Sequence, residues 1–160
     1  MLSSFTSMTA DLQYPMFLVT AAAGGDRDGC LVGFTTQCSI HPARFLVCLS
    51  DKNRTTRIAM EADVVGVHLL ADTDRELADL FGGETGDDVD KLSRWPWSAG
   101  PDGVPILEGP SAWFLGRVLD RVALGDHIGI VLEPIEAHHT ERVRALSSQE
   151  VRDIDPGHPA

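Results

Sequence analysis

The order of strand-like and helix-like segments along the chain most constrains its fold. The segments with the apolar or β-branched character of strands are residues 15–23, 30–36, 44–50, 64–70, 111–122 and 127–135. Helical patterns occur only at residues 55–62 and 73–81. Because helices do not alternate regularly with strands, a doubly wound parallel sheet is not favoured. We therefore predict a mostly β fold, a closed antiparallel β-barrel with helical insertions.

The sequence predicts one domain with an appendage at each end. Its 160 residues, 43% of them hydrophobic, suffice for a single domain with a real core. Residues 1–12 are small and polar and indicate a flexible N-terminal arm, whereas residues 13–140 contain the strands and helices. Residues 141–160 alternate charged with small apolar side chains. This tail could form a short helix or pack on a partner subunit.

One long connection, residues 84–109, is rich in Gly, Pro, Asp and Trp and lacks periodicity. Loops of this length inside a domain are usually functional or disordered. Its Trp95-Pro96-Trp97 sequence favours an ordered loop that could act as a lid or substrate wall. Trp113 alternates with Phe114 on a predicted strand, so we expect it to pack.

Charge and cysteine content narrow the possible partners and compartments. The formal net charge of −11 argues against nucleic acid and anionic membranes as partners, because the long-range field repels both. No apolar run approaches the roughly 20 residues that cross a bilayer, and we see no signal peptide. Three cysteines, at positions 30, 38 and 48, fit neither a disulfide framework nor a zinc site. A reducing cytoplasm is the expected location.

Hydroxyl, amide and cationic side chains gather where the first helix is expected to begin. They follow the strand that ends at Ser50 and include Lys52, Asn53 and Thr55. A helix start offers unpaired N–H groups, which together with such side chains suit a phosphate. The same residues also cap helices that bind nothing, so the segment alone leaves both interpretations open.

Other motifs give weaker signals. His138 and His139 are neighbours on a strand and point to opposite faces, which does not favour a metal site. The Gly-Gly-Glu-Thr-Gly sequence at residues 82–86 follows a helix and lacks the Lys-Ser/Thr ending of a phosphate loop. A Rossmann glycine fingerprint is absent, so a nicotinamide cofactor would bind only transiently. No serine-hydrolase elbow is present either.

Four landmarks, in order and at suitable spacing, resemble the flavin reductase family, which uses the FMN-binding split β-barrel. They are GFTTQCS before a Pro, FLVCLS followed by KNRTT, HLLADTDRELADLFGG, and LGDHIGIV. The resemblance covers roughly residues 13 to 138. One departure is that the run between Thr35 and Pro42 is shorter than in many members, which shifts the expected contacts there by a residue or two.

The resemblance implies a set of cofactor-binding residues. Backbone groups of Phe34, Thr35, Thr36 and Gln37 would lie along the edge of the flavin ring. Cys38 and Ser39 would lie near the ribityl chain or the phosphate. At the helix start, the phosphate would be held by Ser50, Lys52, Asn53 and Thr55. Gly82 and Gly83 would approach the cofactor from the next loop. His127 would be catalytic, beside the nicotinamide or the reactive edge of the flavin.

The same resemblance implies an NAD(P)H-dependent flavin reductase that supplies reduced flavin to a separate monooxygenase. FMN is the expected cofactor, with FAD possible, and NAD(P)H is the transient electron donor. Members commonly form homodimers. Two alternatives stay open: an oxidoreductase that keeps FMN, FAD or deazaflavin bound and acts on another small molecule, and a flavin- or haem-binding module without turnover.

Overall fold

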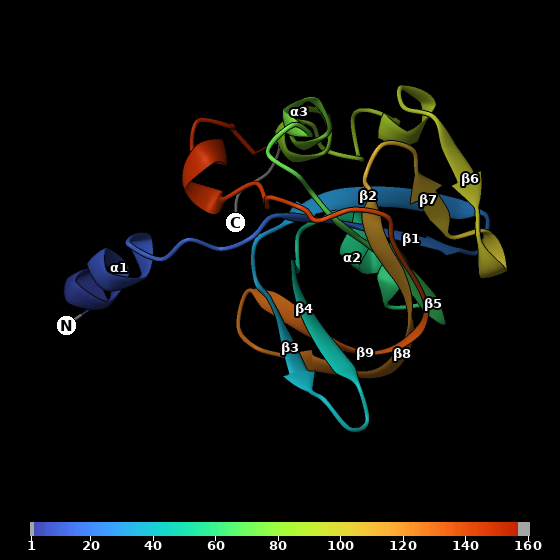
Figure 1. The fold of residues 1–160 in the computed structure, drawn as a ribbon, viewed down its shortest axis with the longest axis horizontal. Helices are drawn as coiled ribbons and strands as arrows, with labels where there is room; N and C mark the ends of the chain where they lie inside the picture. Colours follow the sequence, from blue (N-terminus) through green and yellow to red (C-terminus); the bar gives the residue numbers. More distant parts are fainter. Residues whose placement is uncertain (1, 157–160) are drawn as a thin grey trace.

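A seven-stranded antiparallel sheet curls into a barrel and forms the body of the molecule (Figure 1). The computed structural model describes residues 2–156. Its strands are β1 (Phe17–Ala23), β2 (Asp26–Val32), β3 (Thr35–Ser39), β4 (Arg44–Ser50), β5 (Val64–Leu69), β6 (Trp97–Ala99), β7 (Pro105–Leu107), β8 (Ala112–Ala123) and β9 (His127–His139). Its α-helices are α1 (Leu2–Ala10), α2 (Arg54–Ala59) and α3 (Arg75–Gly83), and the 3₁₀ turns are η1 (Lys91–Ser93), η2 (Pro101–Gly103) and η3 (Ser148–Val151).

The strand order β2-β1-β5-β8-β9-β4-β3 joins segments that are distant in the chain. β2 and β3 follow one another in the chain with a break at Gly33 and Phe34. They are the two edge strands of the sheet: β2 pairs with β1, and β3 pairs with β4. The sheet therefore closes through this bend, leaving β2 and β4 adjacent but unpaired. This confirms the predicted mostly β split barrel.

Apolar side chains from both faces of the sheet form two cores. Along β1, Val19 and Ala21 point into the barrel, whereas Leu18 points outward against α3 and the C-terminal segment. This alternation is the period-two geometry of a strand covered on both faces. The outer core includes Phe81 of α3 and Leu146.

The two predicted helices exist, with shifted ends. Asn53 caps α2, because its side-chain oxygen accepts a hydrogen bond from Thr55 N at 2.9 Å. Asp74, rather than Thr73, stands at the N-cap of α3 and makes no side-chain bond to the helix; its carboxylate accepts from Ala71 N at 2.8 Å instead. The Thr73 and Glu76 pair, whose spacing in the sequence predicts a capping box, therefore does not form one. Gly82 and Gly83 form the last turn of α3 rather than following it.

The long connection folds onto the outer core as an ordered unit containing β6 and β7 (Figure 1). The indole of Trp95 donates to Glu108 O at 2.7 Å, and that of Trp97 donates to Leu92 O at 3.1 Å. Both rings pack against the outer core. The prediction of an ordered loop is confirmed, and the two indole rings help to hold the loop on the outer core.

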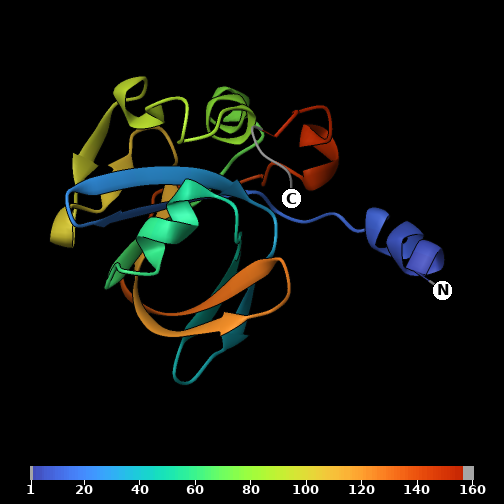
Figure 2. The same cartoon turned by 180° about the vertical axis from the view of Figure 1, so that it is seen from behind.

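The chain ends differ from the sequence-based expectation. The N-terminal arm contains helix α1, which projects away from the barrel (Figures 1 and 2) and has no buried residue. The C-terminal segment packs on its own chain: Leu146 is buried, and Pro15 pairs with Ser147 in an isolated bridge. The fold therefore extends beyond residue 140, and packing of the tail on a partner subunit remains a prediction.

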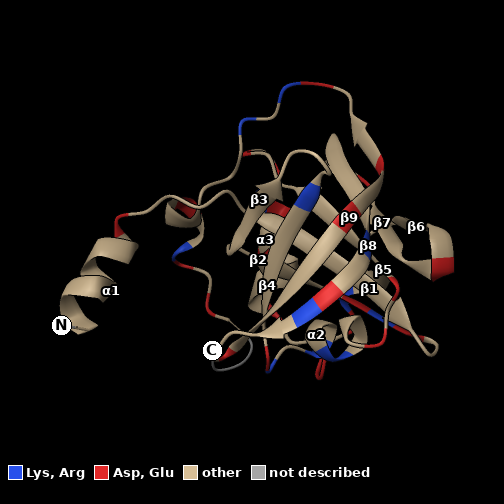
Figure 3. Cartoon of the chain, turned by 90° about the horizontal axis from the view of Figure 1, so that it is seen from below, with Lys and Arg blue, Asp and Glu red and all other residues tan. Residues whose placement is uncertain are grey.

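Acidic positions are distributed over the whole chain, with Lys and Arg between them, rather than gathered on one face (Figure 3). Within residues 2–156, no helix has the length and apolar character needed to cross a membrane.

Candidate functional site

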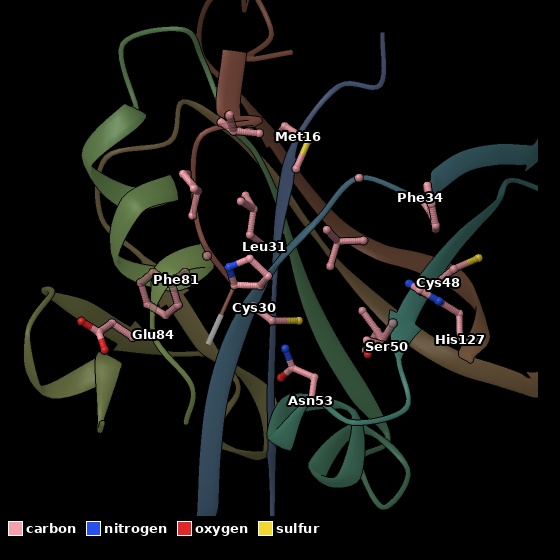
Figure 4. A pocket seen from close by; sticks show the side chains of 17 residues that line it. Met16, Cys30, Leu31, Phe34, Cys48, Ser50, Asn53, Phe81, Glu84 and His127 are labelled. Atoms are coloured by element: carbon pink, nitrogen blue, oxygen red, sulfur yellow. The ribbon is translucent and has the colours of Figure 1, made fainter. Parts of the chain in front are cut away.

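A cavity of about 310 Å³ opens where the barrel is split between β2 and β4 (Figure 4). Side chains from both strands, from the β2–β3 bend, from the end of α3 and from the C-terminal segment line it. They are Met16, Cys30, Leu31, Val32, Gly33, Phe34, Cys48, Leu49, Ser50, Asn53, Phe81, Gly82, Glu84, His127, Val151, Ile154 and Pro156. Most of these are apolar, so the cavity can accept a flat apolar group.

The polar end of the cavity lies at the start of α2. Ser50 and Asn53 line it (Figure 4), and Ser50 Oγ accepts a weak bond from Lys52 N at 3.4 Å. Lys52 itself is exposed and does not line the cavity. Thr55 is fully buried and does not line the cavity. Its hydroxyl interacts with the Cys30 thiol, an interaction that lowers the pKa of that thiol against the larger, opposite effect of burial.

His127 begins β9 and pairs in register with Ser50. Its Nδ1 lies 2.7 Å from Asp126 Oδ1, and its ring centroid lies 5.1 Å from that of Phe34. The hydrogen bond to His127 holds the pKa of Asp126 below its usual value. An ionised carboxylate at Nδ1 fixes the ring orientation and leaves Nε2 as the other available ring nitrogen.

Cys30 and Cys48 both line the cavity, from facing strands. Burial raises the pKa of the Cys30 thiol to about 11, despite the opposing effect of Lys91. Burial also raises the pKa of the Cys48 thiol. Both thiols therefore stay protonated near neutral pH. The nucleophilic form of a cysteine is the thiolate, which neither residue forms at that pH. They contribute neutral, polarisable surface to the cavity rather than covalent chemistry.

The cavity brings together only part of the predicted set: Phe34, Ser50, Asn53, Gly82 and His127. Thr35, Thr36, Cys38 and Ser39 lie on β3 and do not line it, and Gln37 lines a separate, mostly apolar cavity. Gly83 is next to the cavity but does not line it. The roles predicted for these outlying residues remain predictions.

Sequence reasoning missed the apolar walls and the C-terminal wall. Met16, Leu31 and Phe81 belong to strand and helix patterns that indicate core packing, and nothing distinguishes a cavity wall from a core position there. The contribution of Val151 and Ile154 depends on how the tail folds back, which no local pattern indicates.

The cavity fits a flavin. Its apolar walls suit the ring, and its hydroxyl and amide donors at one end suit a phosphate. At Gly82 a Cβ atom would stand 2.7 Å from Leu31 Cδ2, so a side chain there would narrow the cavity. Among residues 2–156, no three His, Cys, Asp or Glu side chains are grouped so as to hold a metal ion. Fold and site together define a split β-barrel of the flavin-binding class.

The chain belongs to the family described as flavin reductase like domain, whose model matches residues 8–151. FMN reductase (NADH) RutF of Stutzerimonas stutzeri is 30% identical over 118 residues, covering 71% of this chain and 67% of that protein. A flavin reductase domain protein from an Arthrobacter species has the same fold, with a TM-score of 0.84 at 22% identity over 94% of this chain and 92% of that one. BorF, the flavin reductase component of a bacterial two-component tryptophan halogenase, has a TM-score of 0.78 at 23% identity over 92% of each chain.

Proposed function

We propose that this protein is an NADH-dependent FMN reductase that hands reduced flavin to a separate oxygenase. The observation that carries the proposal is the cavity at the split of the barrel, apolar along its walls and polar at the start of α2. The similarity to FMN reductase (NADH) RutF supports FMN and NADH as the pair of substrates.

The phosphate would bind at the polar end of the cavity. Ser50 and Asn53 would donate to it, whereas Thr55 is buried behind them and would support the start of α2. Lys52 would add charge from the rim. Helix α2 has only six residues, so its dipole is short and we expect the side chains to provide most of the binding.

The flavin ring would lie between the apolar walls, with Leu31 and Phe81 on one side and Phe34 near its edge. His127 would orient the nicotinamide, since Asp126 fixes its ring and Phe34 packs beside it. When bound, FMN supplies the redox chemistry by accepting a hydride equivalent from NADH. The chain itself would bind and orient FMN and NADH and would exclude water from the cavity.

The transfer of reduced flavin to an oxygenase is supported by BorF, whose description makes it one component of a two-component system. A cytoplasmic location is supported by the three free thiols, which persist in reducing compartments. A homodimer is supported by the apolar side chains of α1, which stay exposed to solvent within residues 2–156.

The direct test is to titrate the purified protein with FMN and to follow NADH oxidation at catalytic protein concentration. Binding of FMN together with FMN-dependent NADH consumption would support the proposal. Stoichiometric reduction that stops after one turnover would favour a protein that keeps its flavin. Absence of both binding and turnover would rule the proposal out.

A further inference from the structure

The C-terminal segment forms one wall of the cavity, and it is held unevenly along its length. Up to Val151 it is fixed firmly: Leu146 N donates to Leu70 O at 2.9 Å, Ser148 N donates to Tyr14 O at 2.8 Å, and Leu146 is 1% exposed. Ser147 and Glu150 add a capping box to η3. Residues 152–156, here called the C-terminal strap, follow this fixed part.

The strap is fastened by Arg75, the first residue of α3. Arg75 Nη1 donates to Glu150 O at 2.7 Å, and Nη2 donates to both carboxylate oxygens of Asp153 at 3.0 and 3.1 Å. Ile154 then packs on the outer core and lines the cavity together with Pro156. A Cβ atom at Gly82 would stand 3.5 Å from Ile154 Cγ2, so the strap lies against the glycine end of α3.

We propose that Arg75 is a positioning residue that fastens the strap as a wall of the flavin cavity, and that release of the strap sets the rate of flavin exchange. This inference rests on the proposed function, because it takes flavin to be the occupant of the cavity.

The ion pair between Arg75 and Asp153 can break readily because both side chains are exposed to solvent. The side chain of Asp153 is 76% exposed and that of Arg75 is 38% exposed. Exposed ion pairs contribute little, and here a single nitrogen, Arg75 Nη2, makes both bonds to the Asp153 carboxylate. A wall held in this way can close over a bound flavin and still open often enough to let reduced flavin leave. This is what hand-over to a separate oxygenase requires.

The chain offers a matched control for a test. Arg75 Nε also binds Asp79 Oδ1 at 2.9 Å within α3, a contact that does not involve the strap. Asp153→Asn removes the charge from the strap side of Arg75, and Asp79→Asn removes the charge from the helix side. Both substitutions are isosteric and lie at exposed positions, so both variants should fold.

We expect Asp153→Asn to raise the Kd for FMN by about 2- to 5-fold, mainly through faster dissociation. The KM for FMN should rise in parallel while kcat is unchanged or higher. Asp79→Asn should match wild type. Asp153→Glu, which restores the charge, should recover most of the affinity. High salt should weaken FMN binding more in wild type than in Asp153→Asn, because only wild type has the ion pair to screen.

Hydrogen exchange of residues 152–156 in the flavin-free protein supplies a readout that does not depend on flavin. Faster exchange in Asp153→Asn than in Asp79→Asn, together with the change in Kd, would support the inference. Equal FMN dissociation rates in the two variants would overturn it, even if the strap exchanges faster. A wild-type protein that binds no FMN would overturn the proposed function itself and this inference with it.

Discussion

At the scale of single residues, His127 and His68 are placed for different tasks. His127 lies at the cavity and is held by an exposed carboxylate. His68 is fully buried: its Nε2 accepts from Leu107 N at 3.0 Å, so its Nδ1 carries the proton donated to Leu18 O at 3.1 Å. One histidine can therefore contact a substrate, whereas the other joins β1, β5 and β7.

Replacing His127 with Gln should raise the KM for NADH more than the Kd for FMN. The reason is that His127 lies at the rim beside Phe34, whereas the phosphate end lies at Ser50 and Asn53. Steady-state kinetics combined with an FMN titration would separate the two effects. His138→Gln, away from this cavity, is the control. An unchanged KM for NADH would mean that His127 has no role in nicotinamide binding.

His68 makes stability depend on pH. Burial lowers its pKa from 6.5 to about 4, although the bond to Leu18 O opposes this. The unfolded chain therefore binds more protons than the native protein between these pH values. Stability from this group is fully present above about pH 6.5 and falls as pH decreases toward 4, by up to about 3 kcal/mol.

Urea unfolding at several pH values between 4 and 7 would measure this loss. His68→Gln keeps one donor and one acceptor but does not titrate, so its stability should vary less with pH than that of wild type. Equal pH dependence in the two proteins would assign the effect to other groups.

At the scale of elements, the sequence predicted the long strands well and missed the short ones. β8 matches its predicted segment to within one residue, because it is long and rich in apolar residues. β9 begins at His127 as predicted but continues to His139, past the apolar part of its sequence. β6 and β7 have three residues each, too few for a period-two pattern. β3 was predicted as part of the preceding strand, because the break at Gly33 and Phe34 is visible only once β3 pairs with β4.

Close packing of β5 gives a test at this scale. At Gly66 a Cβ atom would stand 2.4 Å from Thr20 Oγ1 and 3.1 Å from Pro105 O, atoms that are joined by a 2.6 Å hydrogen bond. Gly66→Ala should therefore lower the free energy of unfolding by about 2–4 kcal/mol. Gly33→Ala, where the nearest atom is Met16 Sδ at 3.4 Å, should cost much less. Chemical denaturation of both variants would measure the two changes in the free energy of unfolding. Equal changes would contradict the view that Gly66 is more tightly packed than Gly33.

At the scale of the whole molecule, helix α1 buries none of its residues against the rest of the described chain. Leu2, Phe5 and Met8 are 79%, 57% and 58% exposed, and isolated helices of this length are marginal in water. Gln149 Nε2 donates to Ala10 O and Leu12 O, so the C-terminal segment fixes where the helix leaves the barrel. The sequence could not predict this arrangement, because it depends on contacts between the two ends of the chain.

Deleting residues 2–10 should leave the monomer as stable as before, because α1 buries nothing within one copy. If α1 packs on a second copy, the deletion should shift a dimer toward monomer in light scattering after size-exclusion chromatography. A Gln149→Ala variant, which frees only the helix exit, should have a smaller effect. Identical dimer dissociation constants for wild type and the deletion would exclude α1 from the interface.

The strand order also has a consequence for how the chain folds. β4 pairs with β9, so Ser50 meets His127 only after about half of the chain has been closed into a loop. Folds dominated by such distant pairings cross their barrier slowly, in milliseconds to seconds. We predict that β2, β4 and His127 assemble the cavity late, after the transition state. FMN should then slow unfolding and leave the refolding rate unchanged.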